Sequence, residues 1–357
     1  MNKGLSIYLE LIRVIATFLV LVSHAAHFAP QWLQLVFAEL KLGRDGVILF
    51  FVLSGYVITW CGIEKETTIK AFALSRASRI YSVALPGLFL GIIASLTYTS
   101  INAEQAHYTL SKAWFYYPLF LTFNSQSWFG FLFPAGNFPY WSLSFEVWYY
   151  IFIGAILFTK RYKILFVILA VILMGPFIAL FLPIWGLGAV LYLTKDKFHV
   201  PKPLCIILFV LSFLGFAVTK YLGFDDHLDQ FNGLVLGSAS AFLPASQFLG
   251  DYFLALIAVV NFYCAYHLNF TFNGVISKVI KLFAGFSFST YMYHTPFFIL
   301  LSCTPLVGFE NGASYVLSIS SALLFCYLLS LVTERKKREI SAFLYHCIEM
   351  VLRLKRR

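Results

Sequence analysis

The sequence predicts an all-α integral membrane protein, a bundle of about ten transmembrane helices with both termini in the cytoplasm. Of its 357 residues, 60% are hydrophobic and 12% are charged, and the mean hydropathy is +0.81, outside the range of soluble domains. Apolar runs of about 20 residues, long enough to cross the hydrocarbon core, recur along the chain. Most of the 26 lysines and arginines fall in alternate connecting segments and in the tail, as the positive-inside rule requires.

Ten apolar stretches are the predicted spans, and a basic tail follows them. They cover residues 7–29, 43–61, 80–100, 141–158, 164–181, 183–193, 204–222, 251–268, 282–303 and 314–332. The fifth and sixth are predicted to form a tight hairpin, because only Leu182 and Pro183 lie at their junction. A polar loop is expected before the third span, and an interfacial element within residues 101–139. Residues 1–333 form the predicted transmembrane domain, and 334–357 an amphipathic tail suited to an anionic membrane surface.

The net charge of +10 does not indicate a nucleic-acid partner, because the basic residues lie in short loops and the tail, where topology explains them. The sequence contains no Gly-rich nucleotide loop, no GxSxG motif and no HExxH motif. These absences count against an NTPase and a serine hydrolase. The six cysteines form no CxxC pair, and no metal is expected.

The first span carries ionisable residues that a simple membrane anchor would lack. Arg13 and His24 are separated by about three whole helical turns, a rise of about 16 Å. One helix face therefore presents a fixed cation at one depth and a candidate general base at another. Charges inside a membrane are costly and usually face a protein interior or a water-filled cavity. The alternative is an ordinary ion pair between Arg13 and Glu10, with His24 near the interface.

Other candidate residues lie near the ends of later spans. The run RASR places Arg76 and Arg79 about one turn apart, where they could hold phosphates through bidentate hydrogen bonds; positive-inside anchoring is the alternative. Glu146, among aromatics in YWSLSFEVWYY, could orient a histidine, accept a proton or contact sugar hydroxyls, or it could be an interfacial residue in contact with water. For His294 we expect structural hydrogen bonding and no catalytic role, and we expect the same for His27.

Five of these segments, in this order, resemble the membrane acyltransferase family 3, which includes O-antigen, nodulation-factor and exopolysaccharide O-acetylases. The opening YLELIRVIATFLVLVSHAAHF resembles the family's acidic-x-x-Arg and Arg-x10-His segment, with Glu10, Arg13 and His24 at matching positions. The other four resemblances are GRDGVILFFVLSGYVI to the FFVLSG motif, RASRIY to RxxR, YWSLSFEVWYY to WSLxxE, and STYMYHTPFF to Tyr-x-x-His-x-Pro. Ile48 departs from the acidic or polar residue that many members carry there. Because no hydrolase-like periplasmic domain accompanies these segments, we expect the membrane-only form.

The resemblance implies transfer of an acyl group, most simply from acetyl-CoA, to a hydroxyl of a cell-surface or lipid-linked glycan at the bacterial inner membrane. Arg13, Arg76 and Arg79 would bind acyl-CoA, and His24 and Glu146 would be catalytic, with His24 as general base. We expect Arg13 and His24 to line one channel, reached by the donor from the cytoplasm and by the acceptor from outside. Direct transfer and an acylated His24 both stay open. The alternative is a transporter or flippase of a glycan or small molecule, which would also contain intramembrane charges.

Overall fold

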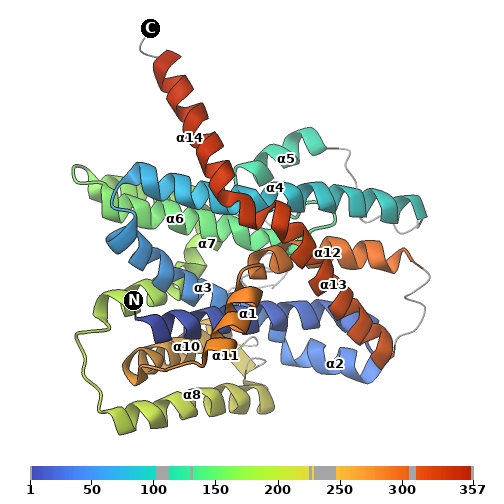
Figure 1. Ribbon diagram of the computed structural model, residues 1–357, viewed down its shortest axis with the longest axis horizontal. Helices are drawn as coiled ribbons and strands as arrows, with labels where there is room; N and C mark the ends of the chain where they lie inside the picture. Colours follow the sequence, from blue (N-terminus) through green and yellow to red (C-terminus); the bar gives the residue numbers. More distant parts are fainter. Residues whose placement is uncertain are drawn as a thin grey trace.

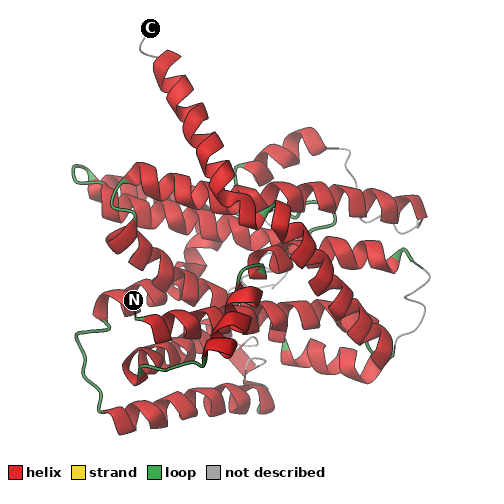
Figure 2. Ribbon diagram, viewed as in Figure 1, coloured by secondary structure: helices red, strands yellow, loops and turns green. Residues whose placement is uncertain are grey.

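The computed structural model describes residues 2–101, 112–128, 132–224, 227–228, 247–304 and 311–354. In these ranges the chain is helical and has no strand (Figure 2). The helices are α1 (Lys3–Ala25), α2 (Gln31–Leu40), α3 (Leu42–Trp60), α4 (Ile69–Ile101), α5 (Ala113–Leu121), α6 (Trp141–Phe158), α7 (Lys163–Thr194), α8 (Lys202–Tyr221), α10 (Phe248–Leu268), α11 (Gly274–Ala284), α12 (Ser287–Ser302), α13 (Gly312–Val332) and α14 (Lys337–Leu354). Single turns form η1 (Ala26–Phe28), η2 (Cys61–Lys65), η4 (Phe138–Tyr140) and η7 (Glu334–Lys336).

Eight segments within the described residues are long and apolar enough to span a membrane, so the chain is a multi-pass membrane protein. The predicted count of ten is not confirmed. Helix α7 is a single helical segment of 32 residues, whereas two spans, 164–181 and 183–193, were predicted in this region. The ninth predicted span is divided, because α11 ends at Ala284 and α12 contains only 16 residues.

Helix α7 is broken at Gly175 and not at the predicted junction of Leu182 and Pro183. Gly175 has φ 80° and ψ 169°, a left-handed φ that glycine adopts without steric cost. The extended ψ is the conformation that a residue before proline prefers, and Pro176 follows. Pro183 lies inside the second arm, as prolines can in membrane helices whose neighbours satisfy the freed backbone groups.

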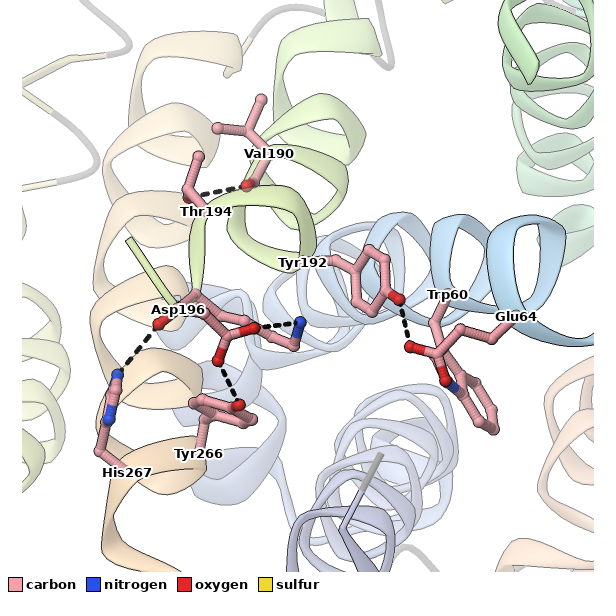
Figure 3. A network of polar contacts seen from close by, with 9 residues as sticks. Trp60, Glu64, Val190, Tyr192, Thr194, Asp196, Tyr266 and His267 are labelled. Carbon is pink, nitrogen blue, oxygen red and sulfur yellow. Dashed lines mark hydrogen bonds and ion pairs between the residues drawn. The ribbon is translucent and has the colours of Figure 1, made fainter. Parts of the chain in front are cut away.

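The two ends of α7 return to the same part of the molecule. Phe158, just before α7, packs against Phe72 at 5.4 Å between ring centroids. Near the other end, Tyr192 donates a 2.5 Å hydrogen bond to Glu64, which also accepts from Trp60 Nε1 at 2.8 Å (Figure 3). Glu64 and Phe72 flank the short connection between α3 and α4, so the two arms of α7 form a hairpin.

Helix α4 begins at Ile69, well before the predicted start of the third span at residue 80. The Thr68 hydroxyl accepts a 3.2 Å hydrogen bond from the Ala71 N–H and so serves as an N-cap. Residues 69–79 contain neither Gly nor Pro, so nothing interrupts the helix once it has begun. The segment predicted as a polar loop is therefore helical, and Arg76 and Arg79 lie within α4.

Close backbone contacts hold the central helices together. Helix α1 packs against α3, α11 and α12 (Figure 1). A Cβ on Gly46 of α3 would lie 2.6 Å from the carbonyl oxygen of Ala16 of α1, and a Cβ on Gly188 of α7 would lie 1.9 Å from that of Val52. Only glycine permits these approaches. The central position of α1 directs one of its faces into the bundle, as the sequence predicts for Arg13.

Candidate active site

A cavity of about 60 Å³ lies where α1, α3, α4, α6 and α12 meet. Its charged lining residues are Arg13, Arg79 and Glu146, three of the five predicted site residues. Because about 10–15 Å³ of such a cavity is enough to hold one water molecule, the cavity has room for about four to six waters. In this conformation it is too small for the arm of a coenzyme.

The guanidinium groups of Arg13 and Arg79 line this cavity. Within the described part of the chain, neither makes an ion pair or a side-chain hydrogen bond. Arg79 only lies over the Phe288 ring, at 5.7 Å. The alternative ion pair between Arg13 and Glu10 is not formed, and Glu10 Oε2 is buried without a partner. Two guanidiniums with free N–H donors at one cavity form a site suited to an anion.

The carboxylates close to these arginines take their hydrogen bonds from other groups. Glu146 accepts from the Tyr150 hydroxyl, and Glu334 of η7 accepts from the N–H and the hydroxyl of Ser289 at 2.9 and 2.8 Å. Both carboxylates act on Arg79 through charge alone. They lower the cost of keeping the cations inside the bundle while leaving the arginine donors free.

Arg76 does not face the same space as Arg79. It forms a 2.6 Å ion pair with Glu66 and lines a separate groove between α4 and α6. Although the two arginines are close in sequence, they point in different directions from α4. Arg79 lines the cavity and Arg76 lines the groove. The structure thus brings Arg13 and Arg79 together and leaves Arg76 apart.

His24, at the far end of α1 from the amino terminus, contacts a second histidine. Its Nδ1 lies 2.7 Å from Nε2 of His294 on α12, and the two rings stack at 4.9 Å with an interplanar angle of 19°. His294 is fully buried, whereas His24 is exposed. The partner that orients His24 is therefore His294, and Glu146 lies in the cavity below.

The hydrogen bonds of His294 define which nitrogen of His24 carries the proton. His294 Nδ1 lies 2.9 Å from the Thr290 carbonyl oxygen, which only accepts, so this nitrogen bears a hydrogen. In neutral His294 the other nitrogen, Nε2, must then accept. His24 Nδ1 donates to it, and His24 Nε2 keeps its lone pair. This is the protonation state that a general base requires.

Arg13 and His24 do not line one open channel in this structure. The residues around the cavity extend to Tyr291 on α12 and do not include His24. The Tyr291 ring packs against Phe50 at 5.6 Å and lies 6.3 Å from the His294 ring. A layer of aromatic side chains thus separates the arginines from the histidines, and the predicted continuous channel is closed here.

His27 takes no part in the histidine pair. It is exposed and packs edge-on against Phe28. In the described ranges no group of three or more His, Cys, Asp or Glu side chains is placed to hold a metal ion. For His294 the sequence predicted structural hydrogen bonding, and its contact with His24 is the feature that the sequence did not predict.

These features define a multi-pass membrane protein. Two arginines without ion-pair partners among the described residues line a cavity inside the bundle, and a histidine near the far end of α1 is oriented by a second histidine. A family model described as "Acyltransferase domain" matches residues 6–331, nearly the whole chain. The chain belongs to the membrane acyltransferase family 3, and the family supports an acyltransferase activity. No curated protein and no solved structure matches the chain, and nothing in these comparisons supports the transporter alternative.

Proposed function

We propose that the protein transfers an acetyl group from cytoplasmic acetyl-CoA to a hydroxyl of a cell-surface or lipid-linked glycan at the bacterial inner membrane. The observation that carries this proposal is the hydrogen-bond chain from Thr290 through His294 to His24. It leaves the His24 Nε2 lone pair available on an exposed side chain. Both termini lie in the cytoplasm in this proposal, as the distribution of basic residues favours.

Arg13 and Arg79 bind anionic groups of the donor. A guanidinium presents a planar set of N–H donors that matches phosphate oxygens, and these two have no competing partner among the described residues. Arg76, expected from the sequence to join them, is already paired with Glu66, so we do not assign it to the donor. To pass from the arginines to His24, the thioester arm must displace the layer formed by Phe50 and Tyr291.

His24 then acts as general base and general acid in turn. Its Nε2 takes the proton of the acceptor hydroxyl, and the oxygen attacks the thioester carbonyl carbon. The new C–O bond forms, the C–S bond breaks, and the leaving thiolate receives the proton from His24. Transient acylation of His24 is the second route open to the same residues. The His294 Nε2 lone pair stabilises the protonated state of His24 by accepting its Nδ1–H.

The test compares surface glycans from cells that carry the wild-type gene, a His24→Ala variant, a His27→Ala variant or no gene. We expect mass analysis to show acetylation with the wild type and with His27→Ala, and none with His24→Ala at matched membrane abundance. Purified wild type and His24→Ala should both bind acetyl-CoA, because the arginine cavity is intact in each. Acetylation in His24→Ala cells, or a wild-type protein that does not bind acetyl-CoA, would contradict the proposal.

A further inference from the structure

A second and larger space lies on the other side of α4. This groove has a volume of about 870 Å³, within the roughly 300–1,000 Å³ typical of ligand sites. It runs between α4 and α6 and is closed by the end of α5 and the start of α7. Most of its lining is apolar, and Ile69, Ile151 and Phe166 at its edge are 60%, 46% and 47% exposed. In a membrane-spanning bundle such an edge is open to lipid.

Two basic side chains line this largely apolar groove. Arg76 of α4 is buried, with 8% of its surface exposed, and its Nε has no hydrogen-bond partner. Lys160 follows the end of α6 and is exposed. A buried N–H without an acceptor is costly unless a ligand or water supplies an oxygen. A ligand in the groove that brings oxygen acceptors close to Arg76 would satisfy this nitrogen.

The charges of the groove select the kind of occupant. Since Arg76 is already neutralised by Glu66 at 2.6 Å, the remaining formal charge is the single positive charge of Lys160. A headgroup with one net negative charge balances it, whereas a zwitterionic headgroup brings an ammonium that the basic groups repel. Basic pockets between membrane helices on the cytoplasmic side commonly bind anionic lipids.

We propose that the groove binds an anionic phospholipid of the phosphatidylglycerol type. Its hydrocarbon chains lie along the apolar wall, and its phosphate oxygens accept hydrogen bonds from Arg76 Nε and Lys160. The lipid is not a reactant, so this site goes beyond the proposed acyl transfer. It adjoins the cavity, because Tyr150 lines the groove and donates its hydroxyl hydrogen to Glu146 of the cavity. A bound lipid would therefore brace α4 and α6, which carry Arg79 and Glu146.

The test is native mass spectrometry of the full-length protein after incubation with equimolar phosphatidylglycerol and phosphatidylcholine. We expect wild type to retain phosphatidylglycerol in preference, and Lys160→Gln to reduce that preference about fivefold, in keeping with the contribution of one basic residue at an anionic surface. Arg76→Gln should reduce it further. Ala155→Trp should block the groove and abolish retention, whereas Ala217→Trp, on the exposed face of α8, should leave it unchanged.

Because Lys160 is exposed, Lys160→Gln keeps the test valid even if a groove-filling variant does not fold. Three results would each overturn the proposal. They are equal retention of both lipids by wild type, unchanged retention in Ala155→Trp, and displacement of the lipid by glycerophosphoglycerol, which carries the headgroup without chains. None of these measurements depends on enzymatic turnover. The lipid-binding proposal can therefore fail while the acyltransferase proposal stands, and the reverse.

Discussion

The hydrogen bond between His24 and His294 allows one prediction to be worked through in detail. His294→Leu removes the acceptor at 2.7 Å and leaves the Nδ1–H of His24 beside an apolar side chain. A hydrogen bond to a charged group contributes about 1.5–3 kcal/mol, and His24 is charged once it has taken the acceptor proton, so at 1.4 kcal/mol per factor of ten kcat should fall about 10- to 100-fold. KM for acetyl-CoA should not change, because Arg13 and Arg79 are untouched. Complete removal of the base in His24→Ala should cost more and leave no transfer above the background of membranes without the protein.

The conservative replacement separates hydrogen bonding from packing. In His294→Gln the side-chain carbonyl oxygen can accept from His24 Nδ1, so the rate should recover to within about fivefold of wild type. Membranes containing the acceptor, given radiolabelled acetyl-CoA at saturation, report the rate of label transfer. Thr295→Val is the matched control, since its hydroxyl lies 3.2 Å from the same nitrogen of His294 but does not orient His24. Equal loss in the Leu and Gln variants would refute the orienting role.

Two further predictions concern the donor site and the packing of the bundle. Arg13→Ala and Arg79→Ala should each weaken acetyl-CoA binding about 10- to 100-fold, since hydrogen bonds to charged groups contribute about 1.5–3 kcal/mol. Calorimetry measures the affinity, and an unchanged affinity in both variants would refute the assignment of these arginines to the donor. Gly55→Ala should lower the melting temperature strongly, because the added Cβ would lie 1.9 Å from the Trp185 carbonyl oxygen and overpacking costs about 1–3 kcal/mol or more. Gly186→Ala, where nothing lies within 4 Å, should melt as wild type does.

The site residues differ in how far the sequence could identify them. A charge within an apolar run is visible to any hydropathy reading, so Arg13 and His24 could be singled out directly. The separation of Arg76 from Arg79 could not, because it depends on where α6 packs against α4. The pairing of His24 with His294 joins residues at opposite ends of the chain, and only the packing of α1 against α12 brings them together. The closed aromatic layer has the same origin, in side chains from different helices.

The turn at Gly175 in α7 has a consequence for the membrane topology of the chain that follows it. Each crossing reverses the direction of the chain, so the parity of the crossings decides on which side every later segment emerges. The sequence predicted two spans joined by a hairpin at Leu182 and Pro183, and in the structure the chain turns back at Gly175. A residue with a side chain would be strained at that left-handed φ, and its Cβ would lie 2.8 Å from the Ser127 carbonyl oxygen. The turn at Gly175 thus brings the lysine-rich connection after α7 back to the side of the molecule from which α7 began.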